Sequence, residues 1–242
     1  MKASDLPIDY NMCEILEHNL EHRADKTALL SEHGTMTFRE VSNQVNQIGN
    51  ALTRLGVRFG ECVAILCPDR PEWVTTFFAT AKIGGVVLGM NTLLTTEEYD
   101  YILKDARVRV LVIHDSLLEL VEPILRNHNI LSKVIVIGAD EGANYTTFND
   151  WIDSEDNKLE FERTHRDDFC SLHYSSGTTG MPKGVMHSHK DYPLIAQLSG
   201  VNLFGLTEND RTFSVAKLFF VYGIGGNLIF PWYVGASCVL NS

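Results

Sequence analysis

The sequence has few of the features that mark membrane, secreted or fibrous proteins. Its 242 residues contain no apolar run near the ~20 residues that a membrane-spanning helix needs. The first ten residues include Asp5, Pro7 and Asp9, so they lack the basic and then apolar pattern of a signal peptide. Internal repeats and low-complexity tracts are absent too. We therefore expect a cytoplasmic protein without a membrane span.

Cysteine is scarce and irregularly spaced. There are five cysteines with no C-x-x-C pair, namely Cys13, Cys62, Cys67, Cys170 and Cys238. This pattern argues against a disulfide framework and favours a reducing compartment. His187 and His189 could form a metal pair on one face of a strand, but no Cys, Asp or Glu completes a ligand set beside them. We predict no metal site in this chain.

Basic residues are in deficit. The chain has 20 Lys and Arg against 31 Asp and Glu, a formal net charge of −11. That balance disfavours a nucleic-acid binder, which needs a basic face. It also means that an anionic ligand must find a local positive site.

One stretch concentrates the glycines and hydroxyls. Residues 174–184 are Tyr-Ser-Ser-Gly-Thr-Thr-Gly-Met-Pro-Lys-Gly. Glycine lets a backbone turn with positive φ and approach a ligand closely, and consecutive turn N–H groups make an anion-binding concavity. The composition predicts an exposed, concave polyphosphate site made by Ser175, Ser176, Gly177, Thr178, Thr179, Gly180 and Lys183. A flexible surface turn is the alternative.

This stretch is not the P-loop of nucleotide triphosphatases, which needs G-x-x-x-x-G-K-[ST]. Aligned on Lys183, Pro182 stands where glycine is needed and Gly184 stands where Ser or Thr is needed. The flanks, 168–174 and 184–189, are short and β-rich. They predict one strand entering the turn and another leaving it.

Strands alternate with helices along most of the chain. Apolar periodicity predicts helices at 11–23, 39–55, 71–81, 97–106, 116–126, 191–203 and 224–233. In the segment 191–203 it predicts a buried side made by Leu194, Ile195 and Leu198. β-rich runs predict strands at 27–30, 35–38, 61–67, 85–89, 108–113, 134–137, 211–215 and 236–240. The alternation predicts an α/β fold of doubly wound, mostly parallel sheet layers covered by helices.

The 174–184 order, followed by Val-Met-His-Ser-His, resembles the phosphate-binding signature of the AMP-forming acyl-adenylate enzymes. That family includes acyl- and aryl-CoA ligases, luciferases and nonribosomal peptide adenylation domains. The resemblance covers nearly the whole chain. Asn-Thr-Leu-Leu-Thr at 91–95 and Ala-Lys-Leu-Phe-Phe-Val-Tyr-Gly at 216–223 look most like the benzoate-type aryl-CoA ligases.

The resemblance implies two half-reactions with ATP, Mg²⁺ and coenzyme A. A carboxylate attacks the α-phosphorus of ATP, pyrophosphate leaves, and a thiol then takes the acyl group. The 175–184 stretch would hold the β- and γ-phosphates. The similarity places an acyl pocket at Phe220, Val221, Tyr222 and Gly223. A small aromatic or cyclic acid suits such a wall, and Lys217 receives no catalytic role.

The resemblance also places the family's later motifs after residue 242. We therefore expect 1–242 to be an incomplete N-terminal adenylation domain, inactive alone and truncated before the later subdomains. Within it we predict N-terminal helices and a hairpin (1–60), an α/β layer (61–138), a surface excursion pinned by Phe148 and Trp151 (139–167), and the phosphate-loop and acyl-pocket region (168–242). A noncatalytic nucleotide-binding fragment and an adenylating enzyme that does not use coenzyme A stay open.

Overall fold

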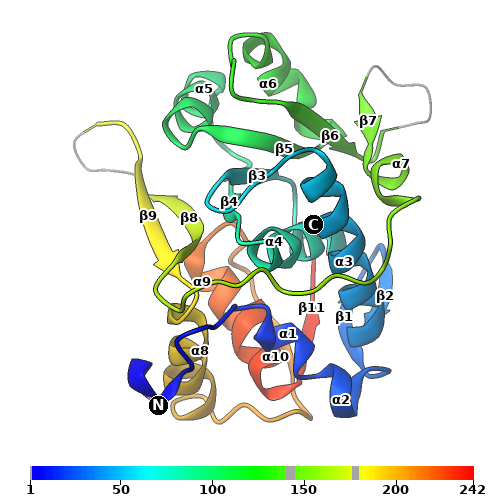
Figure 1. Cartoon of the computed structure of the whole chain (residues 1–242), viewed down its shortest axis with the longest axis vertical. Helices are drawn as coiled ribbons and strands as arrows, with labels where there is room; N and C mark the ends of the chain where they lie inside the picture. The colour runs from blue at the N-terminus through cyan, green and yellow to red at the C-terminus, as the bar shows by residue number, and fades with distance from the viewer. Residues whose placement is uncertain (1, 140–144, 176–179) are drawn as a thin grey trace.

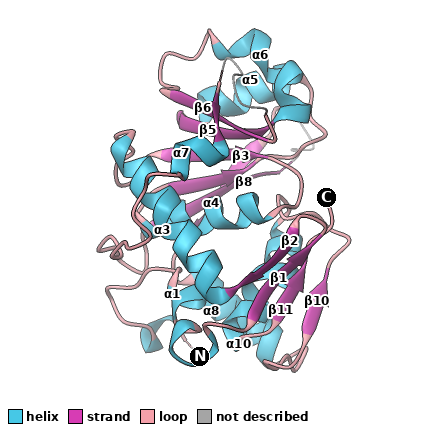
Figure 2. Ribbon diagram, turned by 90° about the vertical axis from the view of Figure 1, so that its right-hand side faces the viewer, coloured by secondary structure: helices cyan, strands magenta, loops and turns pink. Residues whose placement is uncertain are grey.

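The larger of two β-sheets forms the upper half of the molecule (Figures 1 and 2). A computed structural model describes residues 2–139, 145–175 and 180–242. The strand order is β7-β6-β5-β3-β4-β8-β9, and only the β8–β9 pair is antiparallel. The strands are β3 (Cys62–Leu66), β4 (Val86–Gly89), β5 (Val108–His114), β6 (Lys133–Ile137), β7 (Thr146–Thr147), β8 (Phe169–Ser175) and β9 (Lys183–Ser188).

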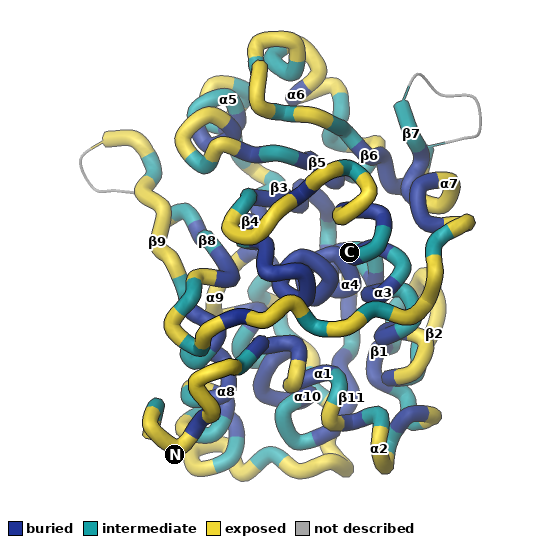
Figure 3. Tube along the Cα trace, viewed as in Figure 1, coloured by how far each residue is buried: buried dark blue, intermediate teal, exposed yellow. Residues whose placement is uncertain are grey.

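Helices cover both faces of this sheet, as the alternating pattern predicted. One face packs against α5 (Thr96–Asp105) and α6 (Leu118–Leu125), and the other against α3 (Phe38–Arg54), α4 (Pro71–Lys82) and α7 (Phe148–Ile152). The helix α4 is buried on nearly every side, between the two sheets (Figure 3). No helix of the described part of the chain is long and apolar enough to cross a membrane.

A smaller sheet closes the lower half of the molecule (Figure 2). Its order is β10-β11-β1-β2, from β10 (Arg211–Phe213), β11 (Ser237–Val239), β1 (Thr27–Ser31) and β2 (Gly34–Thr37). The predicted hairpin is β1–β2, whose pairing is antiparallel. The lower half also contains the short helices α1 (Glu14–Glu17), α2 (Leu20–Arg23), α8 (Asp191–Ile195), α9 (Val221–Ile224) and α10 (Phe230–Val234), of which α10 contacts β11.

Local signals in the sequence fix the regular helices to within a residue or two. The Thr37 hydroxyl accepts a hydrogen bond from the Glu40 amide, and the Glu40 carboxylate accepts one from the Thr37 amide, so a capping box starts α3. Gly56 follows α3 with φ of +80°, a conformation that suits glycine. Pro123 lies inside α6, which ends two residues later.

The helix predicted over 11–23 is wrong, because the chain forms α1 and α2 with a break between them. Asn19 lies at the break and is fully buried. Its side-chain amide donates to the carbonyl oxygens of Ile15 and Trp232, each at 2.9 Å. This tie to α10 is a long-range contact that no local periodicity can report.

The predicted helices at 191–203 and 224–233 both contain π-helical turns, at 196–201 and 225–229. The predicted buried side of the first is also wrong. Ile195 is 43% exposed and Leu198 is 53% exposed, whereas Tyr192 and Ala196 are buried. A widened turn shifts the register of the later side chains relative to an α-helix.

The segment predicted as a surface excursion, 139–167, takes part in the fold. It supplies β7, which pairs with β6 at the edge of the larger sheet, and α7, which packs against α3. Phe148 and Trp151 are buried, and their rings pack edge to face with centroids 6.0 Å apart. The following residues run over the surface back to β8 (Figure 3).

A buried acid joins the two halves of the molecule. Asp69 follows β3, is 3% exposed, and accepts a hydrogen bond from the Leu218 amide at 2.9 Å. Burial raises the pKa of Asp69 from its ordinary 3.8 to about 6, against the lowering effects of the Leu218 amide and Lys217. The folded state therefore binds this proton more tightly than the unfolded chain does.

We predict that Asp69→Asn flattens one part of the pH profile of stability. Because the pKa of Asp69 is raised in the folded state, its protonated form contributes fully to the stability of the fold below pH 3.8. This contribution is lost as the pH rises towards about 6. Asparagine keeps the acceptor and removes the charge, so the variant should exceed the wild type by about 2–3 kcal/mol at pH 7 and equal it near pH 4. Urea unfolding from pH 4 to 7.5 measures the difference.

The exposed Glu119 provides a control for this prediction, because Glu119→Gln removes a carboxylate from the surface of α6. The free energy of unfolding of Glu119→Gln should stay close to the wild-type value from pH 4 to 7.5. Parallel curves for Asp69→Asn and wild type would show that Asp69 does not carry the raised pKa.

Candidate active site

The β8–β9 ribbon projects from the edge of the larger sheet (Figure 1). Its register pairs Ser175 with Lys183 and Tyr174 with Gly184. The predicted strands on either side of the glycine-rich stretch are thus confirmed. The Tyr174 hydroxyl donates to the Asp105 carboxylate at 2.5 Å and so ties β8 to the end of α5.

The predicted phosphate-binding residues lie at the outer end of this ribbon. Ser175, Gly180 and Lys183 are exposed, and Gly180 has φ of +151°. Lys183 makes no ion pair with any described residue. The remaining members, Ser176, Gly177, Thr178 and Thr179, lie outside the described residues. The structure therefore shows where the stretch starts and ends, and its phosphate-binding role stays a prediction.

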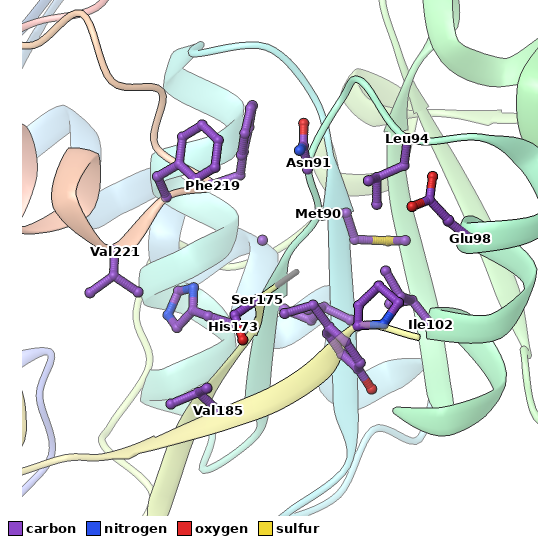
Figure 4. Close-up of a pocket in the computed structure, with 15 residues that line it drawn as sticks. Met90, Asn91, Leu94, Glu98, Ile102, His173, Ser175, Val185, Phe219 and Val221 are labelled. Carbon is purple, nitrogen blue, oxygen red and sulfur yellow. The ribbon is translucent and has the colours of Figure 1, made fainter. Parts of the chain in front are cut away.

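A cavity of about 380 Å³ opens where β4 and β8 end (Figure 4). The carboxyl ends of parallel strands are the edge at which open α/β sheets bind ligands. The lining residues come from four parts of the chain: Leu88, Gly89, Met90, Asn91, Leu94, Glu98, Ile102, His173, Tyr174, Ser175, Pro182, Val185, Phe219, Phe220 and Val221.

The cavity brings together the two stretches that the sequence singled out. Ser175 and Pro182 belong to the glycine-rich stretch, and Phe220 and Val221 belong to the predicted acyl pocket. Phe219 packs against Phe220 with ring centroids 4.5 Å apart. One wall is therefore largely aromatic and lies close to the start of the predicted phosphate site.

Two predicted acyl-pocket residues do not line this cavity. Tyr222 is 78% exposed, and Gly223 is buried behind the wall. The backbone turns from an extended conformation at Phe220 into α9, so successive side chains leave in different directions.

Gly223 lets the wall fold back on itself. A Cβ atom there would overlap the carbonyl oxygen of Lys217 and lie 2.6 Å from that of Ala216. The strand β4 has a similar requirement: a Cβ atom on Gly89 would lie 2.8 Å from the Trp73 ring and 3.5 Å from the Phe219 Cα. Both glycines therefore permit close backbone approach beside the cavity.

The opposite wall comes from the β4–α5 connection, which the sequence analysis did not assign to the pocket. The Tyr99 hydroxyl donates to the Asn91 carbonyl oxygen at 2.9 Å. A capping box between Thr95 and Glu98 fixes the start of α5. The Asn-Thr-Leu-Leu-Thr sequence at 91–95, which resembles the benzoate-type ligases, was the signal in the sequence that could have assigned this connection to the pocket.

His173 is a further lining residue that the sequence analysis missed. It is 5% exposed and projects from β8 towards Tyr192. Burial, with a smaller contribution from the neighbouring His187, lowers the pKa of His173 from 6.5 to about 4. At neutral pH its imidazole is uncharged.

His187 and His189, which were considered as a metal pair, have different hydrogen-bonding and ionic partners. The buried His189 accepts a hydrogen bond from the Met12 amide through Nδ1 at 3.0 Å, whereas His187 lies 3.7 Å from the Asp191 carboxylate. Across residues 2–139, 145–175 and 180–242, no three Cys, His, Asp or Glu side chains gather as a metal-binding group. The Mg²⁺ that the resemblance implied finds no such ligand set among them.

Comparison with known proteins extends these observations. A family model described as AMP-binding enzyme matches residues 16–242. Benzoate–CoA ligase of Thauera aromatica is 38% identical over 241 residues, which cover 98% of this chain and 45% of that enzyme. The 4-hydroxybenzoate–CoA/benzoate–CoA ligase of Rhodopseudomonas palustris is 33% identical over 96% of this chain and 43% of its own length.

Solved structures show the same relationship. The anthranilate CoA ligase AuaEII, in complex with anthranoyl-AMP, is 60% identical with a TM-score of 0.97, over 99% of this chain and 46% of that one. A benzoate CoA ligase from Burkholderia xenovorans LB400 is 31% identical with a TM-score of 0.87, over 96% and 45%.

The chain thus spans less than half the length of these relatives. The predicted α/β fold is confirmed by the superposition on these structures. The match over 16–242 and the likeness to aryl-CoA ligases establish that the chain belongs to the AMP-binding enzyme family.

Proposed function

We propose that the whole protein containing this chain activates a small aromatic carboxylic acid with ATP and transfers the acyl group to coenzyme A. The observation that carries the proposal is the single cavity that touches both Ser175 and Phe220. Two reacting groups held in one cavity meet with a large gain in effective concentration. A noncatalytic nucleotide-binding fragment would not need an aromatic wall beside its phosphate site.

The first half-reaction joins the substrate carboxylate to the α-phosphorus of ATP. The bond from that phosphorus to the β-phosphate bridging oxygen breaks, and pyrophosphate leaves with the electron pair. We assign Lys183 and the 175–180 backbone to the β- and γ-phosphates, where fixed donors and a cation stabilise the departing charge. Lys183 is suited to this because it is exposed and forms no ion pair with a described residue.

The second half-reaction forms a thioester. The thiolate sulfur of coenzyme A attacks the acyl carbon, and AMP leaves with the electron pair of the broken carbon–oxygen bond. We assign Phe220, half-exposed at the cavity mouth, to the position that separates the acyl site from the path of the thiol. The Mg²⁺ expected with ATP would bind mainly through phosphate oxygens and residues outside this chain.

The acid that we propose is a benzoate with small ring substituents, of the 2-aminobenzoate class. Support comes from the anthranoyl-AMP bound by AuaEII and from the benzoates in the names of the other relatives. Phe219 and Phe220 offer aromatic faces to a planar ring, and Val221 narrows the space. Tyr222 stays a predicted pocket residue that does not line the described cavity.

We predict that Lys183→Ala lowers the acid-dependent exchange of pyrophosphate into ATP by about 10²-fold in the whole protein, because it removes one charge that stabilises the departing pyrophosphate. Lys190→Ala is the matched control, since Lys190 pairs with Asp167, and this variant should leave the rate within about twofold.

The 242-residue chain alone should form no aryl-CoA. Full exchange activity in Lys183→Ala, or thioester formed by the 242-residue chain, would contradict these assignments.

We also predict that Val221→Ala changes the preference among ring acids. Removing two methyl carbons from a tight apolar wall should raise kcat/KM for ring-substituted benzoates relative to benzoate by about tenfold, because one methylene in such a pocket is worth about 1–3 kcal/mol. Val215→Ala serves as the control, because Val215 is 87% exposed and does not line the cavity. Kinetics with benzoate, hydroxybenzoates, cyclohexanecarboxylate and a long-chain fatty acid test the proposal.

The proposed acid class would be wrong if the fatty acid gave the highest kcat/KM in the wild type. The assignment of Val221 would be wrong if Val221→Ala and Val215→Ala had the same preferences.

A further inference from the structure

His173 holds a polar atom with no partner at the edge of the cavity. Its ring lies between Ser175 and Val221 (Figure 4). The Nδ1 atom is buried and has no hydrogen-bond partner among the described residues. Because burying an unsatisfied polar atom destabilises the fold, such an atom in a binding cavity points to a ligand group that completes it.

The contacts of Nε2, the other ring nitrogen of His173, determine whether Nδ1 needs a donor or an acceptor from the ligand. The Nε2 atom lies 3.4 Å from the Tyr192 hydroxyl, which lies only 2.6 Å from the Ser171 hydroxyl. A phenol is the stronger donor, so the short contact is assigned to Tyr192 donating to Ser171. The Tyr192 oxygen then accepts from Nε2–H, and Nδ1 keeps a lone pair. His173 is therefore oriented as an acceptor.

No charged group opposes this assignment. The ring of His187 stands edge-on at 5.4 Å from the His173 ring, and no described carboxylate pairs with His173. His187 itself lies beside Asp191. A carboxylate has no proton to donate to this nitrogen at neutral pH, and an uncharged ring offers no charge to attract an anion. The complementary ligand group is a neutral N–H or O–H donor.

We propose that His173 is a specificity-determining residue whose Nδ1 accepts a hydrogen bond from an amino or hydroxyl substituent on the ring of the aromatic acid. The proposal rests on the function proposed above. An unsubstituted benzoate would leave Nδ1 unpaired when it fills the cavity, so the penalty falls on the acid that lacks the donor. His173 thereby selects among ring acids and takes no part in the phosphorus chemistry.

The test compares 2-aminobenzoate with benzoate in the whole protein. The wild type should favour 2-aminobenzoate over benzoate in kcat/KM. His173→Leu should reduce that preference by at least about tenfold, mainly because its kcat/KM for 2-aminobenzoate falls. His173→Asn keeps a side-chain oxygen near the Nδ1 position and should recover part of the preference. Val215→Ala changes an exposed residue outside the cavity and should leave the ratio within about threefold.

A spectroscopic readout separates recognition from a structural role. In protein labelled with ¹⁵N-histidine, the resonance absent from His173→Leu identifies His173. Adding 2-aminobenzoate should move its Nδ1 resonance from the position of a free acceptor towards that of a hydrogen-bonded one, and benzoate should not. A change in folding alone would alter both acids equally and would leave the ratio unchanged.

The outcomes distinguish the two proposals. If neither ring acid is activated by the wild type, the proposed function fails and the role of His173 fails with it. If both acids are activated and His173→Leu keeps the wild-type ratio, the function stands and the specificity role is overturned. An Nδ1 resonance that stays unchanged with saturating 2-aminobenzoate also overturns it.

Discussion

The hydrogen bond from the Leu218 amide to the buried Asp69 carboxylate is the contact on which the candidate site depends. It joins the end of β3 in the larger sheet to the 214–220 segment, which leaves the smaller sheet after β10. That segment has little regular structure of its own. Without a fixed point, its backbone would lose the conformation that holds Phe219 and Phe220 against the cavity. Position 69 carries a hydrogen-bond acceptor because the Leu218 amide needs one at this depth.

Close backbone packing at two glycines also holds the walls of the cavity in place. Gly223 lies against the carbonyl oxygens of Ala216 and Lys217, and Gly89 lies against Trp73 and Phe219. These contacts bring the first turn of α9 and the end of β4 within reach of one small aromatic molecule. The cavity is thus a junction between two sheets, and neither sheet alone contains it. Its two walls come from residues about 130 positions apart in the chain.

The sequence predicts what is local and misses what is tertiary. The helix predicted at 39–55 and the alternation in 61–138 rest on local patterns, and the structure matches them closely. The break at Asn19 depends on a contact with a distant residue, Trp232. At the site, the glycine-rich stretch was recognisable by its unusual composition, and the Phe-Phe-Val run by its resemblance to the family. His173 was not, because one histidine in a β-rich run has no local pattern that separates a packed ring from an acceptor.

Two buried polar groups, one that holds a wall of the cavity and one that lines the cavity, carry a cost that packing alone does not explain. Asp69 has a raised pKa through burial, and His173 keeps an unpaired Nδ1. Asparagine at position 69 would keep the acceptor without burying a charge, and an apolar residue at position 173 would leave no unpaired Nδ1. Departures from local consistency of this kind concentrate at functional sites, where the surrounding fold offsets them. Asp69 acts on the wall and His173 on the space that the wall encloses. The first fixes the shape of the cavity, and the second determines which ring substituents are tolerated inside it.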